Sequence, residues 1–266
     1  MKKFKISVLV GIYNCQETLQ EALDSLYAQT CQDFQIILCD DGSTDRTFEI
    51  AQHNANLHHD KIILIKNQKN MGLNYTLNRC LERADTEFVA RMDGDDISLP
   101  SRFEKELNFL EQNPQYSVVS VPMIYFDDKG EFRRGRGKGD VVARDFVKGS
   151  PVCHAPCMAR TAAFRSVGGY SVSEKLIRVE DYHLWFKLYA AGHKLYMMDE
   201  CLYMMRDDRK AKSRRKWVGR RNTFGLMNWG FREIGLPWYY HIYALRPIVT
   251  YLLPEWLYRF FHKRKR

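Results

Sequence analysis

The chain has 266 residues, of which 45% are hydrophobic and 13% aromatic, and its formal net charge at pH 7 is +9. This composition supports a large core and excludes an intrinsically disordered protein, and the length suits one domain of about 200–250 residues with an appendage. The seven cysteines are an odd number without paired spacing, which excludes a disulfide-stapled scaffold and favours a reducing compartment.

The first half of the chain alternates between two hydrophobic periods. Residues 5–11 (KISVLVG) form an apolar run too short for a secretory signal and followed by no small-residue cleavage site, so we expect a strand. Similar runs predict strands at 34–39, 61–66 and 87–92. Apolar residues at helical spacing predict helices at 17–29, 44–57 and 71–84. The alternation, with uniformly apolar strands, is typical of a mostly parallel sheet flanked by helices, which is an α/β fold.

The alternation loosens after residue 96. A helix is predicted at 99–113, followed by one strand over 116–126 and a glycine-rich charged loop or hairpin over 127–149. A strand at 152–160, a helix at 182–191 and a short strand at 194–198 complete the pattern. No internal repeat is present.

Two acidic clusters follow predicted strands. Asp40 and Asp41 come directly after the second strand, and Asp93, Asp95 and Asp96 follow the fourth. In open α/β sheets ligands bind at the carboxyl ends of the strands, so the two clusters are expected at one edge. Carboxylates held close together repel unless a cation separates them, and carboxylate and diphosphate oxygens suit Mg²⁺ or Mn²⁺. The first cluster also reads as a turn and helix cap, but turn chemistry does not explain three acids within residues 93–96.

Several motifs, in order and spacing, resemble those of family 2 glycosyltransferases with the GT-A fold. They are Tyr13-Asn14, the run 40–45 (DDGSTD), the run 70–73 (NMGL), the run 91–102 (RMDGDDISLPSR), Gly168-Gly169-Tyr170 and the run 180–185 (EDYHLW). The resemblance covers about residues 5–205. It implies a catalytic domain over 1–205, with a C-terminal helical extension over 206–266.

The resemblance also implies roles on the donor side. Ile12 and Tyr13 are expected at the nucleotide, with the Tyr13 ring stacked on the base. Asp41 is expected at the base edge, and Asp40 at the ribose or the sheet end. Asp93 is expected at the ribose or sugar beside Gly94, and Arg91 either pairs with an acid of the cluster or contacts phosphate. Asp95, with Asp93 and Asp96 as further ligands, is expected to hold Mn²⁺ or Mg²⁺ between the phosphates.

On the acceptor side the resemblance implies that Asp181 is the general base of an inverting transferase, with Glu180 and Trp185 nearby. An ordinary acidic first helical turn is the alternative reading of Glu180-Asp181. His154 lies in Cys153-His154-Ala155-Pro156-Cys157, where no second Cys/His pair is near enough for zinc. A hydrogen-bonded structural role and a place beside the metal or the acceptor both remain open for His154.

The basic charge is concentrated in the extension. Residues 206–266 carry 16 Lys+Arg and four acids, a net +12, so the remaining residues are at −3. Residues 242–261 are apolar and aromatic but too interrupted for a spanning helix, and the basic run 263–266 follows them. This pattern favours an anionic membrane interface, with a helix pair packed on the catalytic domain as the alternative. No nucleic-acid recognition motif is present.

These features predict transfer of a sugar from a nucleotide diphosphate sugar to a saccharide or lipid-linked acceptor. The expected donor is a UDP-sugar. The expected setting is the assembly of a bacterial surface polysaccharide or lipopolysaccharide, by a protein peripheral on the cytoplasmic face of the membrane. A sugar nucleotidyltransferase is one alternative, but it needs a glycine-rich basic loop after the first strand, which 11–16 (GIYNCQ) lacks. A non-catalytic membrane scaffold is another, and the intact Asp41, Asp93, Asp95 and Asp181 argue against it.

Overall fold

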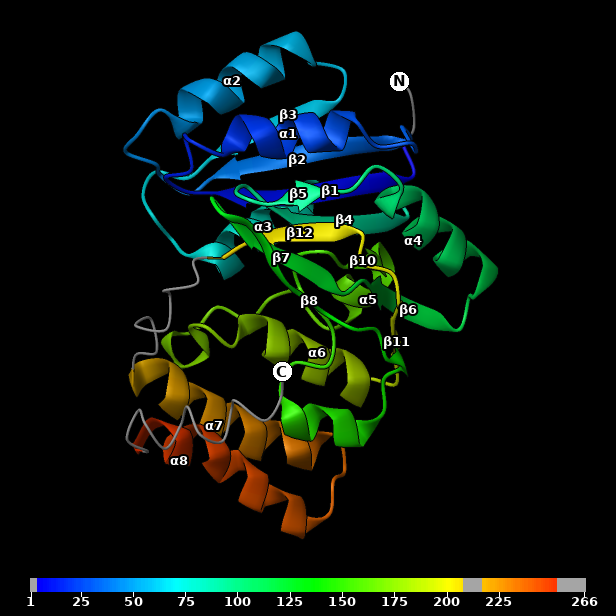
Figure 1. Cartoon of the computed structure of the whole chain (residues 1–266), viewed down its shortest axis with the longest axis vertical. Helices are drawn as coiled ribbons and strands as arrows, with labels where there is room; N and C mark the ends of the chain where they lie inside the picture. The colour runs from blue at the N-terminus through cyan, green and yellow to red at the C-terminus, as the bar shows by residue number, and fades with distance from the viewer. Residues whose placement is uncertain (1–3, 208–216, 253–266) are drawn as a thin grey trace.

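One eight-stranded sheet organises the molecule (Figure 1), a computed structural model that describes residues 4–207 and 217–252. Its strands are, in spatial order, β3 (Ile62–Lys66), β2 (Phe34–Asp40), β1 (Ile6–Ile12), β4 (Phe88–Asp93), β10 (Met158–Arg160), β6 (Tyr116–Ser120), β11 (Lys194–Met197) and β9 (Gly139–Asp140). The first four are mutually parallel, and β10 runs antiparallel to both of its neighbours. The predicted strands of the first half and their parallel arrangement are therefore confirmed.

Helices cover both faces of this sheet. One face carries α1 (Leu19–Tyr27), α2 (Thr47–Leu57) and α4 (Arg102–Gln112). The other carries α3 (Leu73–Arg83), α5 (Thr161–Ser166), α6 (Glu180–Ala190) and α7 (Trp217–Glu233). Alternate residues of β1 feed the two cores, with Val8 and Val10 on one side and Leu9 on the other. Burial on both faces is the reason that the central strands are continuously apolar.

A second sheet differs from expectation. Its order is β5 (Ile97–Ser98), β12 (Tyr203–Arg206), β7 (Met123–Asp127) and β8 (Gly130–Arg134). The single strand predicted over 116–126 is wrong, because β6 and β7 lie in different sheets and Pro122, which has no N–H to donate, separates them. The hairpin alternative for the following segment is confirmed, since β8 pairs antiparallel with β7.

Two other boundaries also differ from expectation. The strand predicted over 152–160 is confined to β10, because Pro156 interrupts the segment before it. The helix predicted to start at residue 44 begins at Thr47, whose backbone N–H donates to the Asp45 carboxylate at 2.9 Å.

The described part of the C-terminal extension packs on the catalytic domain. It comprises α7, the 3₁₀ segment η4 (Trp238–Leu245) and α8 (Arg246–Leu252). Leu226, Phe231 and Ala244 are buried in the same core cluster as Trp185. These elements therefore pack on the catalytic domain, as the alternative to a membrane interface predicts. The expected domain boundary at residue 205 falls within strand β12.

The outer surface of η4 and α8 carries several exposed apolar side chains. Trp238 is 85% exposed, Ile242 68% and Leu252 71%, and Leu245 and Val249 are also exposed. No described helix has the length and apolar character needed to cross a bilayer. Trp256, Tyr258 and the basic run 263–266 lie outside the described residues.

The contact between α6 and α7 generates a prediction. A Cβ on Gly230 would lie 2.5 Å from ring atoms of Phe186, whereas a Cβ on Gly219 of the same helix would meet Arg178 at an ordinary 3.6 Å. Gly230→Ala should therefore lower the free energy of unfolding by about 1–3 kcal/mol, as overpacking does. Gly219→Ala should leave it unchanged or raise it, because alanine favours a helix. Urea denaturation compares the pair, and equal stability of the two variants would contradict the packing described.

Candidate active site

The candidate site lies at the carboxyl ends of three adjacent parallel strands. In the sheet register Ile12 at the end of β1 pairs with Asp40 of β2, and Gly11 pairs with Asp93 of β4. Both predicted acidic clusters therefore flank the end of β1. A cavity of about 540 Å³ opens there and is lined by the β1–α1 loop, by Asp93, Gly94 and Asp95, and by Arg206.

The β1–α1 loop forms one wall of this cavity. The Tyr13 side chain is 46% exposed there, and the Ile12 side chain is buried, so Ile12 can meet a ligand through its backbone. Asn14 has a positive φ of 46°. Its backbone N–H donates to the Ser43 hydroxyl at 3.1 Å, and its side-chain oxygen accepts from the Thr44 backbone N–H at 2.9 Å. The strained turn is thus held against the β2–α2 loop, and the Tyr13 ring is presented to the opening.

Asp40 and Asp41 are both buried and hold loops. The Asp41 carboxylate accepts hydrogen bonds from the backbone N–H groups of Met71 at 2.8 Å and Gly72 at 2.9 Å, and from the Asn67 side chain at 2.7 Å. Asp40 accepts from the Ser43 backbone N–H at 3.3 Å. Both carboxylates therefore hold the loops at the carboxyl ends of β2 and β3 in place, and direct contact with a base or ribose stays a prediction.

At Gly42, which follows these acids, the backbone conformation and the close neighbours leave no room for a side chain. Its φ is +73°, and an added Cβ would lie 2.6 Å from the Lys69 carbonyl carbon. The β2–α2 loop and the 67–72 loop approach closely because this position lacks a side chain.

The second cluster brings three carboxylates together. Ligand oxygens of Asp93, Asp95 and Asp96 lie within 4.8 Å of one another. Asp95 is exposed and Asp96 is buried. Burial, followed by the charges of Asp93 and Asp95, raises the pKa of Asp96 to about 8. Its Oδ2 is buried and accepts no hydrogen bond in the described part of the chain. An orphaned oxygen among three carboxylates fits a hard divalent cation, which takes oxygen ligands of this kind.

Arg91 supplies a buried positive charge beside the cluster. It is 2% exposed, and its Nη2 donates to Asp93 Oδ1 at 2.5 Å. Burial opposes the charged form, but the Asp93 carboxylate outweighs it and raises the pKa of Arg91. Arg91 therefore pairs with an acid of the cluster, which was one of its two expected roles. Its Nε and Nη1 donors are buried and have no partner among the described residues.

Two residues of the site were not anticipated from the sequence. The Arg206 backbone N–H donates to Asp96 Oδ1 at 2.8 Å, and its Nε donates to the Asp95 carbonyl at 3.1 Å. The Tyr203 hydroxyl accepts from the Asp93 backbone N–H at 3.1 Å. Both lie on β12, 110 residues from the acids they contact, and no local pattern signals the pairing.

The acceptor-side acids lie in the first turn of α6. Burial raises the pKa of Asp181, partly opposed by the Tyr182 backbone N–H and by the Arg91 charge. Burial likewise raises the pKa of Glu180, whose Oε2 is buried and has no hydrogen-bond partner among the described residues. The Arg91 charge partly opposes the raised pKa of both Asp95 and Asp181.

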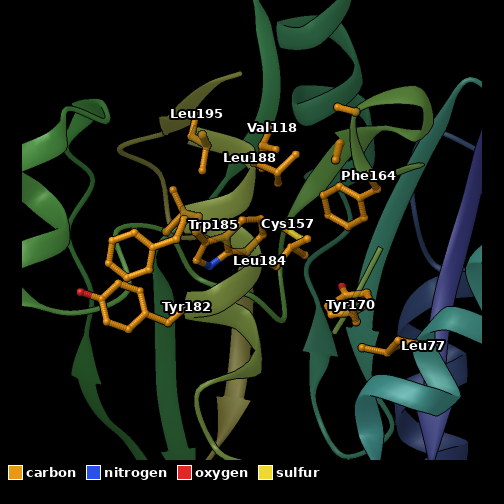
Figure 2. Packing of buried hydrophobic residues seen from close by; sticks show 14 of the residues in the cluster. Leu77, Val118, Cys157, Phe164, Tyr170, Tyr182, Leu184, Trp185, Leu188 and Leu195 are labelled. Atoms are coloured by element: carbon orange, nitrogen blue, oxygen red, sulfur yellow. The ribbon is translucent and has the colours of Figure 1, made fainter. Parts of the chain in front are cut away.

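His154 and Trp185 have structural contacts. His154 Nε2 lies 2.8 Å from the Tyr170 hydroxyl, and burial lowers the pKa of His154 well below its usual value, so the ring is neutral. Trp185 is 0% exposed, and Figure 2 shows it in the core beside Cys157 and Phe164. The Trp185 side chain is buried in the core to which α6 and α7 contribute, and its expected place on the acceptor side stays a prediction.

Comparison with known proteins agrees with this geometry. Residues 7–168 match the family model described as "Glycosyl transferase family 2". The chain is 37% identical to EpsE of Bacillus subtilis (strain 168), a protein named as a glycosyltransferase. The alignment covers 98% of this chain and 94% of EpsE. It is 33% identical to the amylovoran biosynthesis glycosyltransferase AmsE of Erwinia amylovora, over 75% of each chain.

A solved structure shares the fold. The complex of S. aureus TarS 1-349 with UDP-GlcNAc superposes with a TM-score of 0.71, over 94% of this chain and 72% of that one. The sequences are 20% identical in that alignment, so the likeness concerns the GT-A fold. The α/β sheet flanked by helices, with helices following the catalytic domain, is as the sequence motifs imply.

Proposed function

The chain belongs to glycosyltransferase family 2, and from that premise we propose that it transfers a sugar from a UDP-sugar to a saccharide or lipid-linked acceptor, with inversion. One observation carries the proposal: three carboxylates, of which Asp93 and Asp95 line the cavity at the end of β1, have ligand oxygens within 4.8 Å of one another, and Asp96 Oδ2 has no hydrogen-bond partner among the described residues. A donor diphosphate can bind there through a cation. The name of AmsE and the UDP-GlcNAc bound to TarS support a UDP-sugar donor and a role in bacterial surface-polysaccharide or lipopolysaccharide assembly.

The donor is held along the strand ends. The exposed Tyr13 ring stacks on the base, while the Ile12 backbone and the loops fixed by Asp40 and Asp41 enclose it. At Gly94 an added Cβ would lie 3.0 Å from Ile12 and 3.1 Å from the Cys15 sulfur, so glycine lets the loop of the acidic cluster pack closely against the end of β1. The free donors of Arg91 point to a hydrogen-bonding role toward the donor sugar or phosphate.

The acidic cluster would hold a divalent ion, Mn²⁺ or Mg²⁺. Asp95 would be the exposed ligand, with Asp93 and Asp96 beside it. The ion would neutralise the charge that develops on the diphosphate leaving group. Arg206 fixes Asp96 through its backbone N–H, which leaves Asp96 Oδ2 as an oxygen that would bind the ion.

Asp181 is the general base. The acceptor oxygen forms a bond to the anomeric carbon as the bond from that carbon to the diphosphate breaks, and the acceptor proton passes to an Asp181 oxygen. A pKa raised by burial makes this carboxylate a better proton acceptor than an exposed aspartate. Attack from the side opposite the leaving group inverts the anomeric configuration.

The C-terminal elements attach the enzyme to an anionic membrane surface, on the cytoplasmic face. The exposed apolar residues of η4 and α8 bury area in the interface, and the basic charge of 206–266 attracts anionic headgroups. This places the donor site near a lipid-linked acceptor.

Metal dependence is the first expected outcome. Asp95→Ala should lower transfer by about 10³-fold or more, since a metal supplies several kcal/mol of transition-state stabilisation. Excess chelator should do the same to the wild-type protein. UDP-sugar hydrolysis and transfer with added Mn²⁺ are the measurements. Asp128→Ala, which removes an exposed acid of the β7–β8 hairpin, is the control and should be silent. Full activity in chelator would rule out the metal role.

Loss of the base should affect turnover and spare the donor. Asp181→Asn should lower kcat by about 10²–10⁴-fold. UDP affinity, measured by calorimetry, should change little because the donor contacts lie on β1, β2 and β4. Glu174→Gln, an exposed acid seven residues earlier, is the control. A collapse of UDP binding in Asp181→Asn would assign Asp181 to the donor site or to the fold.

Membrane attachment should depend on the exposed apolar side chains. The variant with Trp238→Ser, Ile242→Ser and Leu252→Ser should bind anionic liposomes at least about tenfold more weakly, because it loses buried apolar area at the interface. It leaves the buried Ala244 in place. The control carries Leu57→Ser and Ile63→Ser, which remove exposed apolar groups elsewhere. Flotation at low and high salt measures both, and a wild-type protein that fails to float at low salt contradicts the proposal.

A further inference from the structure

A second cavity lies on the acceptor side of the molecule, apart from the donor cavity. It encloses about 540 Å³ between α6, α7 and the short 3₁₀ segment η2 (Glu174–Leu176), and it shares no lining residue with the donor cavity. The first turn of α6 and the start of α7 lie on the same side of the molecule as the carboxyl ends of β1 and β2 (Figure 1). None of the roles described so far uses this cavity.

Two stacked rings form part of its wall. The His183 and Trp229 rings are stacked, with centroids 4.7 Å apart and an interplanar angle of 23°. Trp229 is 37% exposed. Burial lowers the pKa of His183 to about 4, so its ring is neutral near pH 7 and adds a surface without a charge. An accessible tryptophan face suits the apolar face of a sugar ring.

The charged groups of the cavity are all basic. Lys175 and Arg221 line it, and no carboxylate appears among its described lining residues. In the described part of the chain neither cationic side chain forms an ion pair or a side-chain hydrogen bond. Buried Asn222 anchors the wall, since its Nδ2 donates to the carbonyls of Glu174 at 3.2 Å and Ile177 at 3.3 Å. The cavity is therefore complementary to an anion.

Gly225 leaves open the space above the α7 surface. It lies within the helix, where glycine is less favourable than alanine by about 0.5–1 kcal/mol. A Cβ at Gly230 would strike Phe186, but a Cβ at Gly225 would meet nothing within 4 Å. Packing does not require glycine at this position. The missing side chain instead keeps the cavity free beside Trp229 and Arg221.

The cavity and the proposed base share helix α6. His183, which lines the cavity, is three residues from Glu180 and so lies on the same face of the helix, whereas Asp181 is two residues from His183 and points to another face. An acceptor that occupies both places must extend around α6 and therefore has more than one sugar unit.

From these observations we propose that the cavity between α6, α7 and η2 binds an anionic sugar unit of the acceptor. Trp229 stacks on the ring, and Lys175 and Arg221 pair with its negative group, which is a carboxylate in a uronate or the phosphate of a sugar phosphate. This inference rests on the proposed glycosyltransferase function and adds the class of its acceptor.

The test uses the full-length protein with UDP and diamagnetic Mg²⁺, and follows the Trp229 indole N–H resonance during titration. The probes are cellobiouronate, its neutral counterpart cellobiose, and glucose 1-phosphate. We expect saturable binding of at least one acidic probe, and binding of cellobiose at least about tenfold weaker. Whichever acidic probe binds more tightly identifies the source of the charge. Equal affinity for cellobiouronate and cellobiose, with no binding of the phosphate, overturns the proposal.

Variants at one position separate binding from folding. Gly225→Tyr should fill the cavity and lower the affinity for the acidic probe by about tenfold or more, whereas Gly225→Ala should keep that affinity within about twofold of the wild-type value. Both should unfold at or above the wild-type temperature, because the added Cβ meets no atom. Arg221→Gln should remove the preference for the acidic probe. Wild-type affinity in Gly225→Tyr overturns the proposal.

Donor hydrolysis distinguishes this inference from the function on which it rests. If neither acidic probe binds while Mn²⁺-dependent UDP-sugar hydrolysis persists, the acceptor inference fails and the proposed function stands. If an acidic probe binds at Trp229 but no nucleotide sugar is hydrolysed or transferred, the cavity is an anionic-sugar site and the transferase proposal fails.

Discussion

The gathering of carboxylates at the ends of β2 and β4, on either side of β1, is the constraint on which the rest of the site depends. Burial, followed by the charges of Asp93 and Asp95, raises the pKa of Asp96 to about 8. Arg91 balances one charge through Asp93. In the proposed function a bound cation would compensate the remaining negative charge, and the donor diphosphate, which is itself negative, would bind through that cation.

The acids at this edge divide into two groups by what their oxygens contact. Asp40 and Asp41 are buried, and backbone N–H groups of neighbouring loops occupy their oxygens. Asp95 is exposed and Asp96 keeps a free oxygen. The first pair shapes the cavity and the second group can bind an ion. Gly42 belongs with the first pair, since its lack of a side chain allows the two loops to meet.

The C-terminal elements pack against α6 on their inner side and are exposed on their outer side. Inward, Phe231 and Gly230 pack against α6 and thereby fix the helix that carries Glu180 and Asp181. The same contact forms the cavity beside Trp229. Outward, Trp238 and Ile242 remain exposed. An amphipathic element of this kind can join a membrane surface to an acceptor site without a spanning helix.

The sequence by itself determined the parallel strands, most of the helices, the family and the grouping of Asp93, Asp95 and Asp96, because these follow from local hydrophobic periods and from the rule that parallel strands end at one edge. Tertiary structure alone decided that Arg206 and Tyr203 reach the cluster from a strand 110 residues away. It also placed Trp185 in the core, divided 116–126 between two sheets, and opened a cavity at Gly225. The physical reason is that burial and hydrogen-bond partners depend on which distant segments pack together, and no local pattern of residues encodes that.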